Sequence, residues 1–303
     1  MRPFAIAALQ LALSKGDNAA AIAKEVRLVK ARFPWVEMVI VGELAMYGAN
    51  TALAETLPGR AEDLMAGLAR ELGIWLIPGS LYEQSGSLVY NTASVINPDG
   101  EIVTRYRKMF PFLPYETGVE PGAQFVVFDV PEVGRFGISI CYDMWFTETT
   151  RSLVWMGAEV ILHPTMTNTI DREAELAIAR ASAATNQCYF IDVNVAGELG
   201  LGLSCVYGPG GELIHQAGQG REIMAFEIDL DHVRRVRERG WNGLGQTLKS
   251  FRDADISYPP YETGRRPSEA LNSLGPLEKP QAGRRSRTNP TEPAGSGRTT
   301  HKS

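Results

Sequence analysis

Cysteine is scarce in this chain, with three in 303 residues. An odd and sparse count argues against a disulfide scaffold and favours free thiols in a reducing compartment, so we expect a cytoplasmic protein. The cysteines and the four histidines lack the spacing typical of metal ligands, which predicts no zinc site. No other cofactor is predicted.

Long apolar runs and an excess of basic residues are also missing. No stretch of 18 consecutive apolar residues occurs, so no membrane span is expected. The N-terminal segment could be mistaken for a short secretory signal, but Gln10 interrupts its apolar run and no cleavage site is evident. A formal net charge of -5 argues against general nucleic-acid binding, because phosphates require a basic surface.

What is present is enough apolar sequence for a substantial core, at 44% hydrophobic and 21% charged residues. Short segments rich in Val, Ile, Phe and Tyr, bounded by turn residues, predict strands. They are Phe4–Leu11, Met38–Gly42, Ile74–Tyr82, Tyr90–Ile96, Glu101–Tyr106, Gln124–Val130, Gly134–Ile140, Glu159–His163, Tyr189–Val195, Leu203–Tyr207 and Ile223–Ile228. The turn signals 97–100 (Asn-Pro-Asp-Gly) and 208–211 (Gly-Pro-Gly-Gly) predict two hairpins.

Helical spacing of apolar residues appears between these strands. It predicts helices over Asn18–Phe33, Arg60–Leu72, Glu148–Met156 and Arg172–Thr185, the second ending at Gly73. Strands that alternate with helices indicate an α/β fold in layers, with helices on both outer faces.

The composition changes near residue 261. Residues 263–303 are rich in Pro, Gly, Ser, Thr and Arg, and carry eight Lys and Arg against three Glu, a charge of +5. Such a segment buries too little surface to offset its ordering entropy. We therefore predict a folded domain over residues 1–261 and a disordered basic tail over residues 262–303.

The first chemical signal is the sequence Gly-Ile-Ser-Ile-Cys-Tyr-Asp, in which Cys141 ends a β-rich run just before a predicted helix. A cysteine on a strand-to-helix turn is exposed at the end of a sheet, and a neighbouring backbone N–H can point toward an oxyanion. The alternative is a structural buried cysteine. Cys188 and Cys205, inside apolar runs, are interpreted as that kind.

Two charged residues also stand at strand ends. Glu43 follows a buried strand and precedes apolar residues, so desolvation is expected to raise its pKa, as suits a general base. Lys108 follows the strand after the first hairpin. The alternatives are a glutamate that faces water and a solvated lysine.

Together, Gln10 in the first strand, Glu43, Tyr-Arg-Lys108 after a Pro-Asp-Gly hairpin, and Gly-Ile-Ser-Ile-Cys141-Tyr-Asp resemble the nitrilase, or carbon–nitrogen hydrolase, superfamily. The resemblance covers most of residues 1–261 and implies a four-layer α-β-β-α sandwich. It also implies that Glu43 takes the thiol proton, that Lys108 stabilises the oxyanion and that Cys141 forms a thioester. A protonated thiol requires such an activating base.

The segment 111–122 is similar to the amidase and formamidase branches, which implies that Glu116 is a fourth catalytic residue. The backbone N–H of Tyr142 is expected to serve the oxyanion. Tyr47, Trp145, Thr165 and Met166 are predicted to shape the substrate pocket, although core packing is an equal alternative for each.

The substrate stays open at this point. True nitrilases carry Cys-Trp-Glu at the nucleophile and aliphatic amidases usually carry Cys-Asp-Asp, whereas this chain has Cys-Tyr-Asp. N-carbamoyl amidohydrolases are similar at Trp145-Phe146. The resemblance therefore implies hydrolysis of a small amide or N-carbamoyl compound to an acid and ammonia. An acyltransferase that passes the thioester to an amine, and a catalytically silent binding protein, are the alternatives.

A small-molecule amide is thus the expected partner. The resemblance also implies a homodimer or higher homo-oligomer, with Asp231–Glu238 and Trp241–Phe251 at or near the subunit contacts.

Overall fold

The computed structural model describes residues 2–261, 268, 271 and 274–279. Residues 2–112 and 116–254 form one compact unit, and the described residues among 113–115 and 255–279 belong to a second. The described part of the second unit includes one short helical turn, η4 (Pro259–Tyr261). The tail predicted over residues 262–303 lies mostly outside the described residues, so its disorder and the boundary at residue 261 stay predictions.

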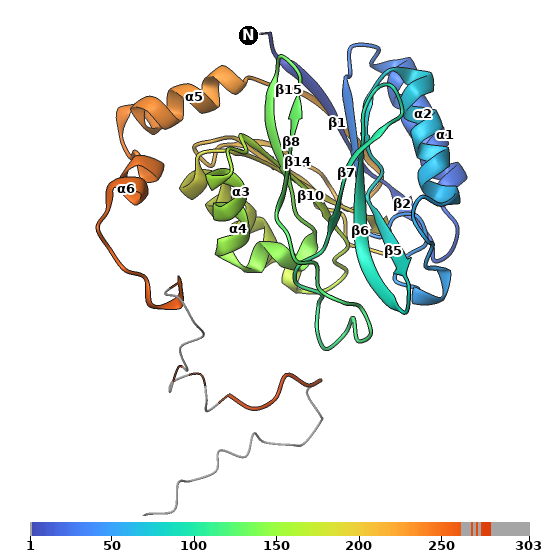
Figure 1. Ribbon diagram of the computed structural model, residues 1–303. Coiled ribbons are helices and arrows are strands. Elements are labelled where there is room, and N and C mark those ends of the chain that lie inside the picture. Colours follow the sequence, from blue (N-terminus) through green and yellow to red (C-terminus); the bar gives the residue numbers. More distant parts are fainter. Residues whose placement is uncertain (1, 262–267, 269–270, 272–273, 280–303) are drawn as a thin grey trace, which may run out of the picture. The chain divides into compact units, whose positions relative to one another are not determined.

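The larger unit contains two main sheets (Figure 1). The first has seven strands in the order β15-β1-β3-β4-β6-β5, with β7 also paired to β6. Its strands are β1 (Phe4–Gln10), β3 (Met38–Val41), β4 (Trp75–Ile77), β5 (Ser80–Ser85), β6 (Leu88–Ile96), β7 (Ile102–Arg107) and β15 (Glu222–Ile228).

The second sheet has six strands in the order β14-β13-β11-β10-β9-β8. They are β8 (Val126–Val130), β9 (Gly134–Ile138), β10 (Val160–Thr165), β11 (Tyr189–Asn194), β13 (Cys205–Tyr207) and β14 (Leu213–Gln216). A separate small ladder joins β2 (Ala12–Leu13) to β12 (Ala196–Gly197).

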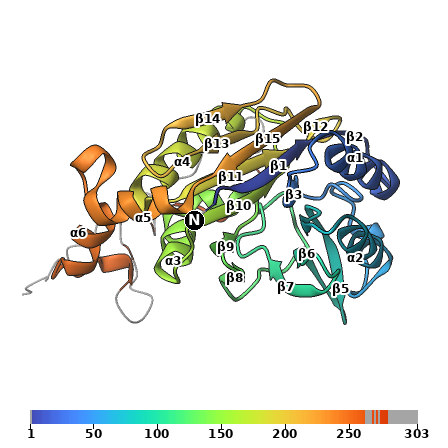
Figure 2. The ribbon, with the colours of Figure 1, turned by 90° about the horizontal axis from the view of Figure 1, so that it is seen from above.

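Helices cover the outer face of each sheet. Figure 2 shows α1 (Ala19–Arg32) and α2 (Arg60–Leu72) on one side, and α3 (Thr147–Trp155) and α4 (Asp171–Asn186) on the other. Their apolar faces pack on the sheets, as the buried Met65 and Leu68 of α2 illustrate. α2 ends at Gly73, whose φ of +61° is the left-handed cap that glycine adopts without strain. α5 (Leu230–Arg239) and α6 (Thr247–Asp253) follow the last strand, with η3 (Trp241–Gly243) between them.

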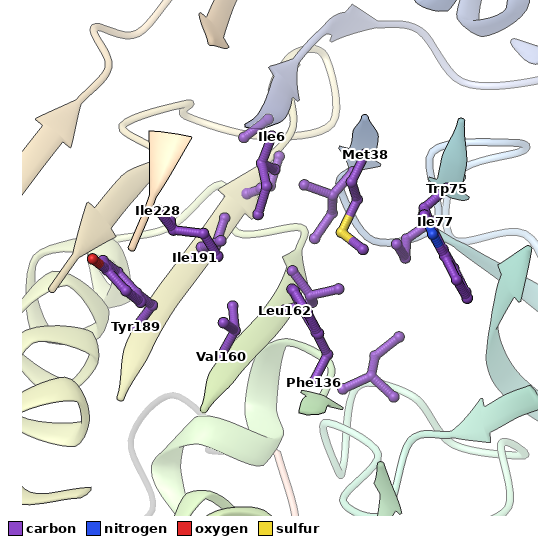
Figure 3. Close-up of a cluster of buried hydrophobic side chains, with 14 of the residues drawn as sticks. Ile6, Met38, Trp75, Ile77, Phe136, Val160, Leu162, Tyr189, Ile191 and Ile228 are labelled. Carbon is purple, nitrogen blue, oxygen red and sulfur yellow. The ribbon is translucent and has the colours of Figure 1, made fainter. Parts of the chain in front are cut away.

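The main core lies between the two sheets (Figure 3). Ile6 and Met38 of the first sheet pack there against Phe136, Leu162 and other residues of the second. All four of these side chains have no measurable exposure. A second cluster lies between the first sheet and its helices, and a third lies between the second sheet and its helices. The order helix, sheet, sheet, helix is the predicted four-layer sandwich.

Most of the predicted strands and helices are present, and their ends differ from the predicted ends by one to three residues. Both hairpins are confirmed, since β6 pairs with β7 and β13 with β14 in antiparallel register. The predicted single strand Ile74–Tyr82 is wrong: Pro78 and Gly79 divide it into β4 and β5. A side chain at Gly79, whose φ is +83°, would lie 2.0 Å from the carbonyl oxygen of Gly42, so the backbone turns where only glycine fits. No residue range was predicted for β14, the second strand of the hairpin at 208–211.

The topology brings several strand ends to one edge. β1, β3 and β4 are parallel, and β9, β10 and β11 are parallel. β7 also runs with β4, because both are antiparallel to β6. Where the two sheets face each other, the backbone N–H of Glu43 after β3 donates to the carbonyl of Thr165 at the end of β10, at 3.1 Å.

Candidate active site

Glu43 is carried into the space between the sheets by the end of β3. The preceding Gly42 packs so closely against the second sheet that a Cβ there would lie 3.0 Å from the carbonyl oxygens of Thr165 and Val193. This close approach leaves Glu43 only 2% exposed. The alternative of a strand-end glutamate that faces water is therefore wrong.

Lys108 directly follows β7 and is 1% exposed, so the alternative of a solvated lysine is also wrong. Its backbone N–H donates to the carbonyl of Asn91 on β6 at 2.8 Å. Its Nζ donates to Oε1 of Glu43 at 2.8 Å and to Oε2 of Glu116 at 2.7 Å. A single ammonium group thus bridges two of the predicted site carboxylates.

Glu116 lies on the segment that follows Lys108, and its side chain is 12% exposed. Its carboxylate accepts the backbone N–H of Phe112 at 2.6 Å and the hydroxyl of Tyr82 at 3.2 Å. Asn91 donates to Glu43 at 2.8 Å and to Glu116 at 3.4 Å, so it links the two carboxylates. Glu116 is therefore largely buried and bonded within the site, and it is not an exposed loop carboxylate.

Cys141 begins the short helix η2 (Cys141–Trp145) just after β9. Its φ of +46° lies in the left-handed region that non-glycine residues seldom adopt, a strained conformation often found at functional sites. The carboxylate of Asp143 holds this turn, because it accepts the backbone N–H of Ile140 at 2.8 Å and that of Phe110 at 2.9 Å. Asp143 also accepts the hydroxyl of Tyr106 at 2.6 Å.

Burial and charge tune the three central groups differently. Burial raises the pKa of Glu43, against the opposing effect of the Lys108 ammonium. Burial alone would lower the pKa of Lys108, but Glu43, the Cys141 sulfur and Glu116 raise it well above its ordinary value. Burial, followed by the charge of Glu43, raises the pKa of Cys141 well above its ordinary value. The site therefore combines a permanent cation, a thiol that stays protonated and a carboxylate of increased basicity.

Glu116 is tuned in the opposite direction from Glu43. Burial alone would raise its pKa, but the charge and hydrogen bond of Lys108 lower it below its ordinary value. Of two carboxylates on one ammonium, Glu43 is thus the one suited to accept a proton.

An aromatic cluster adjoins the Cys141 turn. The ring of Tyr142 packs edge-on against Phe112 at a centroid distance of 4.9 Å and against Phe146 at 5.4 Å. Trp145 lies 6.3 Å from Tyr142 and is 38% exposed. Trp145, predicted to shape the pocket, thus lies beside the ring of Tyr142, the residue predicted to serve the oxyanion through its backbone N–H.

The other three predicted pocket residues have different surroundings. The hydroxyl of Tyr47 donates to Glu55, and its ring belongs to the core between the first sheet and its helices. The hydroxyl of Thr165 donates to Asp192 at 2.7 Å. The side chain of Met166 packs on the buried cluster of Leu44, Tyr82 and Val119, while its backbone acts on Cys141 and lowers the thiol pKa.

Three side chains at the site, those of Tyr82, Asn91 and Thr167, were not predicted from the sequence. Asn91 lies in the predicted strand Tyr90–Ile96, where an amide on a buried position was the available signal. Thr167 lies two residues beyond Thr165, and its Oγ1 is 3.8 Å from the sulfur of Cys141. Cys188 and Cys205 are fully buried, as predicted, and burial raises the pKa of Cys188 to about 12.

No group of His, Cys, Asp and Glu within the described residues has the arrangement of a metal site. In the same part of the chain no helix has the length and apolarity to cross a membrane.

The sequence of this chain matches a known protein family. The sequence model of the family described as carbon-nitrogen hydrolase matches residues 5–238. This chain belongs to the carbon–nitrogen hydrolase family. It is accordingly a hydrolase that acts on carbon–nitrogen bonds other than peptide bonds, and its resemblance to the nitrilase superfamily is confirmed.

Among curated relatives of this family, omega-amidase NIT2-B of Xenopus laevis is 31% identical over 262 residues, which cover 79% of this chain and 93% of that protein. Omega-amidase NIT2 of Homo sapiens is 30% identical over 260 residues, with the same coverage of 79% and 93%.

Solved structures of the superfamily share the fold. Saccharomyces cerevisiae Nit3, a member of branch 10 of the nitrilase superfamily, has a TM-score of 0.72 at 25% identity and covers 78% of this chain and 94% of its own. A carbon–nitrogen hydrolase from Helicobacter pylori G27 has a TM-score of 0.75 at 24% identity, with 87% and 99% covered. The predicted fold class is confirmed.

Proposed function

We propose that this hydrolase cleaves a small non-peptide amide to a carboxylic acid and ammonia, or an N-carbamoyl compound to an amine, carbon dioxide and ammonia, through a thioester on Cys141. One observation carries the proposal. The buried Lys108 ammonium is held between Glu43 and Glu116 and is close enough to Cys141 for its charge to favour the ionised form of the thiol. Relatives named omega-amidases at 30–31% identity support an amide substrate.

In the first half of the reaction Glu43 takes the thiol proton while the sulfur attacks the carbonyl carbon. Because the pKa of the thiol is raised, the resting sulfur carries its proton and requires a base at the moment of attack. Two of the three N–H donors of Lys108 bind the carboxylates. Among the described residues nothing accepts the third, which is left for the developing oxyanion.

A second donor for the oxyanion is the backbone N–H of Tyr142, the second residue of η2, since the first N–H groups of a helix have no intrahelical acceptor. Glu43 then gives its proton to the departing nitrogen, and ammonia leaves as the carbon–nitrogen bond breaks. Water, deprotonated by the same Glu43, attacks the thioester carbon, and the carbon–sulfur bond breaks to release the acid and restore the thiol.

In this proposal Glu116 orients the substrate amide, a role supported by its ionised carboxylate and its hydrogen bond to the same ammonium as Glu43. The rings of Tyr142 and Trp145, which follow Cys141 on η2, are the proposed contacts for the substrate's acyl group. Tyr47 and Thr165, which bond to Glu55 and Asp192, are better described as supports of the site than as substrate contacts.

The test is a screen for ammonia release over small amides, N-carbamoyl compounds and nitriles. Cys141→Ala is expected to abolish release, whereas Cys188→Ala, which removes a buried thiol elsewhere, is the matched control and retains it. Intact-mass measurement during turnover is expected to find an acyl adduct on Cys141. Equal ammonia release by wild type and Cys141→Ala would overturn the proposal, and product formed on an added amine would indicate acyl transfer instead.

We also propose a cytoplasmic homo-oligomer. Three free cysteines fit a reducing compartment. Trp155 and Met156 at the end of α3 are 62% and 41% exposed, and apolar side chains of this size are common at subunit contacts. Light scattering on the purified protein tests the assembly, and a monomeric mass at micromolar concentration would contradict it.

A further inference from the structure

A second buried ionic cluster, which the mechanism above does not use, lies on the second sheet and α4. Arg172, 1% exposed, donates through Nη1 to Glu175 at 3.1 Å and through Nη2 to Asp192 at 2.6 Å. Nη2 also donates to the carbonyl of Leu203 at 2.8 Å. Glu175 and Asp192 are themselves buried. The cluster thus holds two carboxylates against one guanidinium.

This cluster reaches the nucleophile through one side chain. The hydroxyl of Thr167 donates to Oε1 of Glu175 at 2.9 Å, and the same oxygen lies 3.8 Å from the sulfur of Cys141. Glu175 is close enough that its charge opposes ionisation of the thiol.

The backbone of Thr167 is fixed as well. Asn194 at the end of β11 accepts the N–H of Thr167 at 2.9 Å and donates to its carbonyl at 3.0 Å. Asn194 also donates to the carbonyl of Gly202 at 2.8 Å. Backbone and hydroxyl of Thr167 are therefore held independently, which leaves the oxygen little freedom to move away from the sulfur.

The number of hydroxyl protons decides what Thr167 can do. A threonine hydroxyl has one proton, and here it is directed to the Glu175 carboxylate. Only the lone pairs of Oγ1 are left to face the sulfur. They can accept a hydrogen bond from the thiol, but they offer no donor to a thiolate.

We propose that Thr167 and Glu175 form a second contact on the nucleophile, which orients the Cys141 sulfur and keeps it a thiol until Glu43 removes the proton. Thr167 touches the reacting atom, whereas Glu175 and Asn194 act through it as positioning residues. The pair adds no bond-making step: the proton still passes from sulfur to Glu43. The inference rests on the proposed function, because it assigns a state to the same nucleophile.

The charged groups that face the sulfur are Glu43 and Lys108 from the first sheet and Glu175 from α4. Glu175 itself faces Arg172 and, beyond it, Asp192. Replacement of Glu175 by glutamine removes one of the two carboxylates that oppose ionisation of the thiol. The sulfur is then expected to ionise at lower pH.

The experiment is alkylation of Cys141 by iodoacetamide as a function of pH, with the modified peptide identified by mass spectrometry. Glu175→Gln is expected to react several times faster than wild type near neutral pH, with its pH midpoint moved down. Glu173→Gln, an exposed glutamate on the same helix, is the matched control and is expected to follow wild type. An unchanged alkylation profile in a folded Glu175→Gln variant would overturn the inference.

Thr167 is tested by kinetics. Thr167→Val is expected to lower kcat about tenfold with little change in KM, because one contact to the reacting sulfur is lost. Thr167→Ser restores the hydroxyl and is expected to recover most of kcat. Equal kcat for wild type and a folded valine variant would contradict the contact. These outcomes are distinct from failure of the proposed function, which appears as ammonia release by Cys141→Ala.

Discussion

Two buried cations in this hydrolase each hold two carboxylates, yet they are built differently. Lys108 stands at a strand end of the first sheet, and one of its partners, Glu116, keeps 12% side-chain exposure. Arg172 lies on a helix over the second sheet, and both of its partners are 4% exposed or less. The lysine cluster thus has an open side and an N–H for a substrate oxygen. The arginine cluster has both terminal nitrogens bound and serves to hold other groups.

Burial of an ion pair therefore does not by itself identify a catalytic group. An ammonium bound to two carboxylates keeps a third N–H for a substrate oxygen. Both terminal nitrogens of the guanidinium bind groups of the protein, which a ligand could replace only with loss of structure. Variants of the two clusters are therefore expected to fail in different measurements.

Lys108→Met is expected to have the largest effect. Loss of an oxyanion donor typically lowers turnover by about 10²–10³-fold. Two buried carboxylates would also be left without their cation, which typically destabilises a protein by about 3–5 kcal/mol. Initial rates of ammonia release and urea unfolding measure the two losses. Turnover above a tenth of wild type would contradict the role of Lys108.

Arg172→Met is expected to act mainly on stability. Glu175 and Asp192 would lose their only guanidinium among the described residues, at a cost of about 3–5 kcal/mol in the free energy of unfolding. Turnover per folded molecule should fall less than in Lys108→Met. Arg239→Met removes an arginine with 71% side-chain exposure and should change stability by less than about 0.5 kcal/mol. If Arg172→Met and Arg239→Met unfold at the same urea concentration, the arginine cluster is not structural.

Asp143 differs from the carboxylates of both clusters. This buried carboxylate is held by hydrogen-bond donors and has no ion pair among the described residues. An asparagine side chain at this position would offer one acceptor oxygen in place of two, so Asp143→Asn is expected to destabilise the protein by about 1–3 kcal/mol.

The same variant carries a pH signature. Burial raises the pKa of Asp143 to about 6 from an ordinary value of 3.8. The folded state therefore binds the proton more tightly, and stability from this group is present below pH 3.8 and lost as pH rises through 6. The stability of wild type relative to Asp143→Asn should fall over that interval. A difference that is constant with pH would contradict the shift.

Glu116→Gln is expected to have the smallest effect on stability, and beside the loss of turnover that follows from a substrate-orienting residue it should shift one limb of the pH profile. The charge of Glu116 contributes to the raised pKa of Glu43. Without that charge, Glu43 should stay ionised to lower pH, so the acid limb of kcat/KM should move to lower pH. A limb that moves to higher pH would show that another group limits the rate.

The sequence predicted the layers and the three central site residues because both leave local signals. Strands such as β1 and β10 are apolar over most of their length, and Glu43, Lys108 and Cys141 each stand at the end of a strand segment. The motifs around Lys108 and Cys141 then supplied a family resemblance that no single residue carries.

The arginine cluster left no such signal. Arg172 and Glu175 are three residues apart on α4, a spacing that resembles a solvated ion pair. Their burial depends on Asp192 and Leu203 from other segments, which only the tertiary fold brings near. Thr167 was missed for a similar reason: a loop sequence does not tell which of several threonines turns toward the sulfur.

The hydrogen bond from the backbone of Glu43 to the carbonyl of Thr165 joins the two halves of the sandwich at the place where the reaction occurs. An incompletely assembled chain therefore has a base without its nucleophile, or a thiol without its activator. Recovery of turnover during refolding should therefore coincide with docking of the second sheet on the first. The rate of turnover is then a measure of how many molecules have completed their tertiary structure.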